Sequence, residues 1–378
     1  MEEWKEYKLG EVVDILDYKR IPLSSKERST RHGTYPYYGA QGIIDYIDDY
    51  IFDGTYLLIA EDGENLKSQK QDVAQLASGK YWVNNHAHIV DSNGKCDIRY
   101  ICYLLNTLDL SGYITGSAQP KLNQANLVKI SITLPSLETQ KRIADCLSIF
   151  DDKIEVNRRI NDNLEKQGQA LFEKYVMNPN TPRTQLLCDY AFINPTRTIA
   201  KGRTARCIDM SSLPTKGSFP NEWTFKGYNG GMKFQNGDTI MARITPCLEN
   251  GKTAYINFLD DDEVAFGSTE YIVLSAKEGF CSELLYFLAR YDDFVSYAVA
   301  HMNGSSGRQR VSGNDIANYT MSHISKETLD VISEKLHGIM EVIKNNSLES
   351  RRLAELRDTL LPRLMSGEIN INEIENKI

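Results

Sequence analysis

The spacing of apolar residues divides the chain into two stretches rich in short strands and two long helical stretches. In residues 136–177, apolar side chains are separated by four, three and four positions, at Ile143, Leu147, Phe150 and Ile154. This spacing places them on one narrow stripe of a helix and is typical of the seam of a coiled coil. The stretch is therefore predicted to be one long helix that packs against a partner helix.

The last quarter of the chain repeats this helical stretch at an offset of 189 residues (325 − 136), so that Ser325 aligns with Ser136. Both serines precede a helix-forming run, and both are predicted to cap a helix N-terminus. The full predicted seam consists of Ile143, Leu147, Phe150, Ile154, Leu164 and Leu171 in the first copy and Ile332, Leu336, Ile339, Ile343, Leu353 and Leu360 in the second. About 40 residues at ~1.5 Å each form a rod of roughly 60 Å. We expect the two rods to pair as an antiparallel coiled coil.

The middle of each predicted seam is polar, with Asn157 and Asn161 in the first copy and Asn346 and Ser350 in the second. A buried asparagine costs stability but fixes the register of a helix pair. The alternative is a locally frayed segment whose amides are hydrated. The pattern alone leaves both interpretations open.

The remaining stretches have the short apolar runs and the Gly, Asn and Asp breaks of small α/β domains. Strands are predicted at residues 56–60, 87–90 and 129–134, with a helix at 97–105, and the same order recurs at 238–242, 270–273, 283–288 (helix) and 318–321. The predicted class is α+β, with an internal pseudo-two-fold repeat. The predicted domains are a globule at 1–135, a helical spacer at 136–178, a second globule at 179–324 and a second helical spacer at 325–378.

Composition places the chain among ordinary proteins of the aqueous phase, with 41% hydrophobic and 25% charged residues and no apolar run near the ~20 residues of a membrane span. The acidic opening Met1-Glu2-Glu3 lacks a signal sequence, and seven cysteines occur without a C-x-x-C pair. These features predict a reducing, cytoplasmic location and no metal site.

The sequence contains none of the phosphate-binding, dinucleotide-binding, zinc-protease or serine-hydrolase motifs. His86 and His88 alternate along a predicted strand, so that one of them is expected to face outward, and they lack a Cys or Asp at ligand spacing. We therefore predict no catalytic residues, no metal and no cofactor in this chain.

Basic residues and short hydroxyl side chains follow the first strand-like element of each globule, ahead of the strands at 56–60 and 238–242, where they could contact phosphate oxygens. These candidates are Lys19, Arg20, Lys26, Arg28 and Arg31 in the first globule and Arg197, Lys201, Arg203 and Arg206 in the second. The alternative is a solvated loop with no ligand.

A second paired feature precedes each rod, where residues 116–123 align with 305–312 at the same offset and Lys121 aligns with Arg310. Arginine can contact guanine in bidentate fashion in the major groove, and glutamine or asparagine can contact adenine. The candidates here are Gln119, Lys121, Asn123, Arg308, Gln309 and Arg310, together with Arg243, Tyr38 and Gln41 from other loops. The loops could alternatively only shape the junction between globule and rod.

In its order of segments the chain resembles the specificity subunits of type I restriction-modification enzymes. The resemblance covers the whole chain and is carried by residues 37–42, 116–123, 134–143, 241–246 and 360–368. It implies that each globule recognises half of a split, asymmetric DNA site through the major groove. It also implies that the helices set the gap and bind two adenine-methylating subunits, which would use S-adenosylmethionine, and that a nuclease and translocase subunit joins the full enzyme.

The formal net charge of −8 opposes this interpretation, because a DNA-binding protein needs at least local basic surface. An acidic coiled-coil scaffold whose globules bind proteins is the alternative function. The second junction also departs from the resemblance, since Arg308-Gln309-Arg310-Val311-Ser312 replaces Gln119-Pro120-Lys121-Leu122-Asn123.

Overall fold

The computed structural model describes residues 4–116, 119–177, 182–305 and 307–372. The chain forms two compact units, a first unit of Met1–Asp152 with Leu353–Ile378 and a second unit of Lys153–Arg352. The predicted boundary between residues 178 and 179 lies outside the described residues. Both long helices contribute to both units. The first unit is formed from two separate stretches of the chain, and the second is one continuous stretch.

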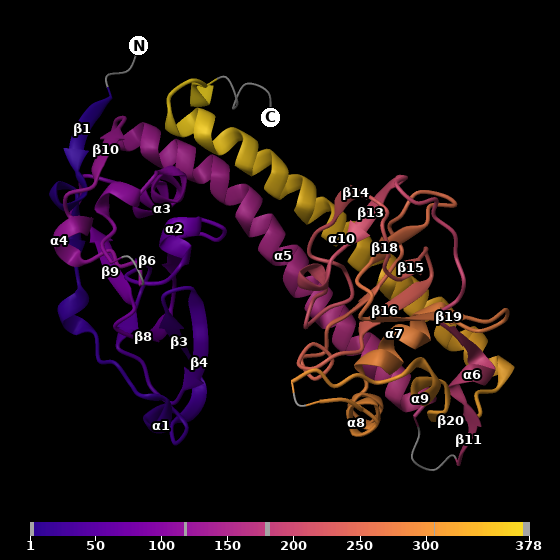
Figure 1. The fold of residues 1–378 in the computed structure, drawn as a ribbon. Coiled ribbons are helices and arrows are strands. Elements are labelled where there is room, and N and C mark those ends of the chain that lie inside the picture. The colour runs from indigo at the N-terminus through magenta and orange to yellow at the C-terminus, as the bar shows by residue number, and fades with distance from the viewer. Residues whose placement is uncertain (1–3, 117–118, 178–181, 306, 373–378) are drawn as a thin grey trace. The chain divides into compact units, whose positions relative to one another are not determined.

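The first unit contains three small sheets (Figure 1). One pairs β1 (Lys5–Lys8) with β10 (Ser131–Leu134). The second has the order β2-β9-β6-β7, formed by Val13–Ile15, Ala87–Ser92, Tyr56–Ala60 and Ala74–Ala77. The third has the order β4-β3-β8-β5, formed by Gly42–Ile47, His32–Gly39, Lys80–Val83 and Phe52–Asp53. Its shorter helices are α1 (Ser25–Arg28), α2 (Asn65–Ser68), α3 (Ile98–Thr107) and α4 (Gln124–Leu127).

The second unit repeats this topology strand for strand. β11 (Arg183–Leu186) pairs with β20 (Thr320–Ser322). The order β12-β19-β16-β17 is formed by Ala191–Ile193, Tyr271–Ala276, Asp238–Ala242 and Thr253–Tyr255. The order β14-β13-β18-β15 is formed by Thr224–Gly227, Thr204–Ile208, Ala265–Gly267 and Lys233–Phe234. Its shorter helices are α6 (Leu187–Tyr190), α7 (Ser282–Arg290), α8 (Asp292–Ala300) and α9 (Gly313–Ala317). The predicted mixed α/β class and its internal repeat are confirmed.

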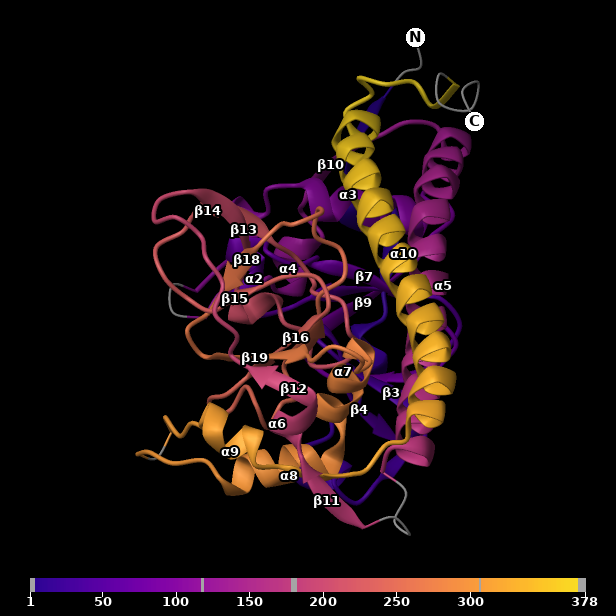
Figure 2. The same cartoon turned by 90° about the vertical axis from the view of Figure 1, so that its right-hand side faces the viewer.

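The two predicted rods are the helices α5 (Leu137–Tyr175) and α10 (Lys326–Met365). Ser136 and Ser325 each accept a hydrogen bond at their hydroxyl from the amide three residues later, at 3.3 Å in both cases, as expected for N-caps. In the first unit the start of α5 packs with the end of α10, through Ile143, Leu147 and Leu364. In the second unit the end of α5 packs with the start of α10 (Figure 2). In each unit the two helices therefore run antiparallel.

The predicted seam residues do more than join the helices. Within the first unit Ile143 and Leu147 belong to the same core as Tyr100 and Leu105 of α3. In the second unit Ile332, Leu336 and Ile343 share a core with the residues of α7. All twelve predicted seam residues are buried or half-buried. Nine of them lie in or against the two cores that also contain residues of the globules. Residues of the apolar stripe on each helix thus contribute to the hydrophobic core of each unit.

The polar middle of the helix pair is ordered. Asn157 is only 1% exposed, and its amide nitrogen donates to Glu349 at 2.8 Å, Ser350 at 3.2 Å and the carbonyl of Asn346 at 3.3 Å. Asn346 in turn donates to Asn161 at 2.9 Å. These bonds favour the interpretation as a register-fixing contact over a frayed segment.

Within the described residues, none of the helices combines the length and the apolar content that crossing a membrane requires.

Candidate nucleic-acid interface

The loop before α4 is tied to the end of strand β6, and this pairing is called the first junction (residues 61–63 with 119–123). The amide of Leu122 donates to the carbonyl of Glu61 at 2.8 Å, and the amide of Gly63 donates to Pro120 at 3.2 Å. The loop closes on itself through two bonds of 2.8 Å between the main chains of Thr115 and Lys121. Its main chain is therefore fixed on both sides.

The second junction (residues 243–245 with 308–312) has the same main-chain bonds. Val311 donates to Arg243 at 3.0 Å and Thr245 donates to Gln309 at 3.1 Å, so these positions keep the offset of 189 (311 − 122). On the upstream side, however, Arg310 pairs with Asn303, whereas an offset of 189 from Thr115 would give position 304. The second loop is therefore one residue longer, a difference that the sequence alignment did not predict.

Asn123 and Ser312 occupy equivalent places as the N-caps of the short helices that follow. The side chain of Asn123 accepts from the amide of Asn126 at 2.9 Å, and that of Ser312 accepts from Asp315 at 3.1 Å. The candidate Asn123 thus has a structural bond that positions the loop.

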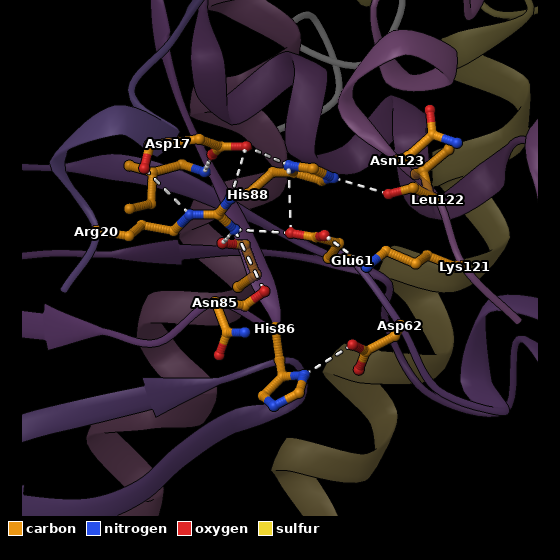
Figure 3. A network of polar contacts seen from close by, with 12 residues as sticks. Asp17, Arg20, Glu61, Asp62, Asn85, His86, His88, Lys121, Leu122 and Asn123 are labelled. Carbon is orange, nitrogen blue, oxygen red and sulfur yellow. Dashed lines mark hydrogen bonds and ion pairs between the residues drawn. The ribbon is translucent and has the colours of Figure 1, made fainter. Parts of the chain in front are cut away.

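The side chains of the first junction form an ion network around Glu61 (Figure 3). Glu61 contacts Lys121 at 3.1 Å and Arg20 at 2.7 Å, and Arg20 also contacts Asp17 at 3.2 Å. Burial alone would raise the pKa of Glu61, but its hydrogen bonds with Arg20 and Lys121 bring it below the ordinary range. Two of the predicted candidates, Arg20 and Lys121, therefore meet on one carboxylate.

His88 lies inside this network and is 1% exposed. Its Nδ1 faces Asp17 at 2.5 Å, and its Nε2 faces the carbonyl of Leu122 at 2.7 Å. Asp17, Glu61 and His88 offer ligand atoms within 4.8 Å of one another, a geometry that a metal ion could use. However, both ring nitrogens already have hydrogen-bond partners within the protein, and Arg20 and Lys121 already balance the carboxylates. The cluster is better explained as an ion network than as a metal centre.

His86 is the histidine that faces outward, with 49% of its side chain exposed. Its Nδ1 contacts Asp62 at 2.7 Å (Figure 3). Its amide donates to the side chain of Asn84 at 2.8 Å. A side chain added at Gly63 would lie 3.9 Å from the amide nitrogen of Gln41. Asp62, His86 and the candidate Gln41 therefore lie close to the first junction.

The second junction carries different charges at equivalent backbone positions. Because Ala60 pairs with Ala87 and Ala242 pairs with Tyr271, Glu61 corresponds to Arg243 and His86 corresponds to Glu270. Glu270 accepts three hydrogen bonds from Arg310 at 2.7–3.0 Å. These bonds lower the pKa of Glu270. A carboxylate thus contacts the junction cation in both repeats, but it comes from a different strand in each.

Several of the predicted basic candidates are engaged within the protein. Arg28 pairs with Asp45 at 2.9 Å, and Arg31 pairs with Asp48 at 2.8 Å. The side chain of Arg197 is 9% exposed and pairs with Asp238 at 2.8 Å. Arg206 is 8% exposed and lies against Trp223, Phe225 and Phe258, with Glu263 at 3.2 Å. These four arginines support the globules and offer little to a ligand.

The other candidates divide by exposure. Tyr38 is half-buried with its ring edge against Tyr81, and Arg243 is half-buried near Glu270. The exposed candidates are Lys19, Lys26, Gln41, Gln119, Lys201, Arg203, Arg308 and Gln309. Among the junction cations, Lys121 is also exposed, with 50% of its side chain accessible, and Arg310 is 37% exposed.

A cavity of about 560 Å³ in the first unit lies against α3 and both long helices. Asp72, Asp151 and Asp358 line it, with Arg357 bonded to Asp151. Burial raises the pKa of Asp72. Its acidic lining is unsuited to a phosphate, so the cavity is not part of the candidate interface.

Sequence reasoning did not identify Asp17, Glu61, Asp62 or Glu270 as parts of this region. The available signal was the register of the repeat, since Glu61 and Asp62 follow directly after the predicted strand 56–60. Glu270 lies at the start of a predicted strand. The equivalent residue of the first repeat is His86, which is not acidic, so the sequence repeat does not reveal the role of Glu270.

Comparison with known proteins identifies similar chains. The family described as the type I restriction modification DNA specificity domain matches residues 1–166. A Haemophilus influenzae protein named as a candidate type I restriction enzyme specificity subunit is 37% identical over 145 residues, which are 38% of this chain and 36% of that protein. The HindI specificity subunit of the same organism is 21% identical over 98% of this chain and its own full length (100%).

A solved structure of a type I restriction-modification system S subunit from M. genitalium has a similar fold. It superposes with a TM-score of 0.58 at 16% identity and covers 96% of each chain. At this identity the likeness concerns the fold. It supports the arrangement of two α/β globules with two long helices.

Proposed function

We propose that this chain is a specificity subunit of the type I restriction-modification family and recognises DNA for a type I complex. In this proposal the chain has no catalytic site of its own. Each globule recognises one half of a bipartite, asymmetric site through the major groove. The division into target-recognition domains at 1–135 and 179–324 and spacers at 136–178 and 325–378 is part of the same proposal.

The observation that carries the proposal is the pair of junctions. Their main-chain bonds are equivalent, while Glu61, His86 and Lys121 in the first are replaced by Arg243, Glu270 and Arg310 in the second. A common backbone with different functional groups suits two readers of related but different ligands. The two halves of an asymmetric DNA site are such ligands.

The exposed candidates would divide the work of binding. Lys19, Lys26, Lys201, Arg203 and Arg308 would contact phosphates, while Gln41, Gln119 and Gln309 have amides suited to base edges. The net charge of −8 then reflects the rest of the surface. Local basic loops against an acidic background limit non-specific binding, since phosphate contacts supply most of it.

The helices α5 and α10 would set the gap between the half-sites and bind two methyltransferase subunits. The complex would methylate adenine at N6 with S-adenosylmethionine bound in the methyltransferase partner, and a restriction and translocase subunit would complete an endonuclease. The cytoplasm is the compartment in which such a complex meets chromosomal DNA.

A gel-shift titration of the chain in complex with its methyltransferase partner tests the proposal. At moderate salt we expect tighter binding to a bipartite target than to a scrambled duplex of equal length. The double change Lys201→Ala and Arg203→Ala should weaken binding to both duplexes, because it removes phosphate contacts. Equal affinity of the unaltered complex for both duplexes would refute sequence recognition.

The alternative, a protein-binding scaffold, is motivated by the acidic net charge. It predicts that Lys121→Ala and Arg310→Ala leave DNA binding unchanged. The same titration therefore separates the two functions.

A further inference from the structure

Resting on the proposed function, we propose that Arg310 recognises a guanine in the half-site of the second globule. Glu270 is then the positioning residue that orients the Arg310 guanidinium toward that base. The inference is drawn from the geometry of this ion pair and from its contrast with the first junction.

The guanidinium of Arg310 is fixed on two of its three sides. Its Nε contacts the Glu270 carboxylate at 2.9 and 3.0 Å, and its Nη2 contacts the same group at 2.7 Å. Its Nη1 donates to the carbonyl of Arg308 at 3.0 Å. An arginine has five N–H groups in a rigid planar fork. Two N–H groups remain, one on each terminal nitrogen. In this proposal they make the parallel pair of hydrogen bonds that matches O6 and N7 of guanine.

The main chain at Arg310 is also fixed. The amide and the carbonyl of Arg310 both bond to Asn303 at 2.9 Å, and the flanking residues Gln309 and Val311 bond to Thr245 and Arg243. The side chain is nevertheless 37% exposed. A group that is ordered before binding loses little conformational entropy when it contacts a ligand.

The charge of Arg310 is balanced within the protein. The hydrogen bond from Arg310 lowers the pKa of Glu270, so the carboxylate is ionised at neutral pH. A guanidinium whose charge is balanced by a carboxylate adds little to the non-specific attraction between the protein and DNA phosphates. The neighbouring Arg308 is exposed and can contribute to that attraction. The expected contribution of Arg310 is therefore to base discrimination.

At the position of Arg310 the first junction has no guanidinium, and the guanidinium of Arg20 is occupied by Asp17, Glu61 and the carbonyl of Ala87. Lys121 has a single ammonium group, which contacts Glu61 at 3.1 Å, and the position of Glu270 is taken by His86, which contacts Asp62. An ammonium cannot make the planar bidentate contact of a guanidinium. Recognition of guanine by this route thus belongs to the second half-site alone, which fits an asymmetric target.

Methylation mapping of host DNA, with the chain and its methyltransferase partner expressed together, tests the inference. With Arg310→Lys, which keeps the charge, we expect discrimination at one guanine of one half-site to fall about tenfold or more. Non-specific affinity and its salt dependence should stay the same, because they follow the charge. With Glu270→Ala, the complex should discriminate less well at the same guanine, while its non-specific affinity for DNA stays equal or rises. Glu270→Gln, which retains the shape of the side chain, should give the same loss in milder form.

Arg183 and Asp293 provide a matched control in the same unit. They form an ion pair at 2.9 Å between β11 and α8, and the arginine side chain is 35% exposed, but neither residue is part of the second junction. Arg183→Lys and Asp293→Ala should therefore leave the methylated sequence unchanged.

Two results would overturn the inference. One is an unchanged motif in Arg310→Lys and Glu270→Ala, and the other is an equal loss at every position of both half-sites. If the unaltered complex methylates no bipartite motif at all, the proposed function itself fails, and this is seen before any variant is compared.

Discussion

At the residue scale, the first junction depends on two carboxylates that remain charged inside the protein. Burial would raise the pKa of Asp17, but its hydrogen bond with His88 and nearby positive charge bring it below its ordinary value of 3.8. Glu61 is likewise held below 4.5. A lowered folded-state pKa stabilises the fold above the unfolded pKa, and this contribution disappears as pH falls through the folded value. The first junction is therefore expected to loosen in acid.

Asp17→Asn should destabilise the first unit by about 1–3 kcal/mol at neutral pH, because it removes a charged partner from buried His88. The difference from the unaltered chain should shrink as pH falls below 3.8 toward the lower pKa that Asp17 has in the folded chain, because the stabilisation from its lowered pKa is lost over this range. Hydrogen exchange of the Ile89 amide, which donates to Asp17 at 2.9 Å, reports the change.

The matched control for this prediction is Asp45→Asn, because Asp45 pairs with Arg28 at the surface of the same unit and is 34% exposed. Such surface pairs contribute about 0–1 kcal/mol. Equal effects of the two substitutions would contradict the assignment of a structural role to the buried network.

The sequence predicted the positions of many cations but not what they contact. Lys121 and Arg310 align at the offset of 189, whereas their acidic partners come from different strands, Glu61 from the end of β6 and Glu270 from the residue before β19. Partners of this kind depend on strand register, which periodicity does not supply. Exposure could not be predicted either, since Arg203, directly before β13, is exposed while Arg206, within β13, is buried.

At the element scale, α5 and α10 each contain a glycine, and the two glycines differ in how closely other side chains approach them. A Cβ on Gly168 of α5 would lie 2.2 Å from the ring of Phe287, which is 1% exposed. A Cβ on Gly338 of α10 would meet nothing within 4 Å. The first glycine therefore permits close packing of α7 on α5, and the second has no packing role.

Gly168→Ala should destabilise the second unit by about 1–3 kcal/mol, because the ring must move within a packed core. Gly338→Ala should stabilise it by about 0.5–1 kcal/mol, since alanine is the better helix former. Urea unfolding of the full chain measures both. Equal effects of the two changes would show that the approach of Phe287 to α5 does not limit packing.

The polar middle of the helix pair leads to a prediction about register. Replacing Asn157 and Asn161 together by Leu should leave the thermal midpoint equal or higher, because buried amides cost stability. The altered complex should nevertheless accept a wider range of gaps between half-sites, which methylation mapping detects. A single unchanged gap would mean that register is fixed elsewhere.

The spacing of apolar residues predicted both helices to within a few residues, because a 3–4 repeat over about 40 positions is a strong signal. It did not predict that Ile143 and Ile332 also belong to the cores of globules. Tertiary packing determines whether a third element covers the apolar stripe of a helix pair. The sequence of the stripe is the same whether or not such an element is present.

At the scale of the whole molecule, the chain consists of two units of equivalent topology, each completed by parts of both long helices. The proposal that these helices determine the gap between half-sites has a geometric consequence. Inserting four residues in both helices, next to Ile160 and Glu349, adds about one turn, or ~5.4 Å. With ~3.4 Å per base pair, the preferred gap should widen by roughly one to two pairs. An unchanged gap in the methylated motif would show that the length of the helices does not determine the gap between half-sites.

The central claim is that one chain carries two different readers of DNA. Methylation mapping in a host that carries the unaltered chain with its methyltransferase partner tests it most directly. The account predicts one asymmetric motif made of two half-sites at a fixed gap, with a guanine required in one of them. A continuous motif, a palindromic one, or the absence of any methylated sequence would contradict it.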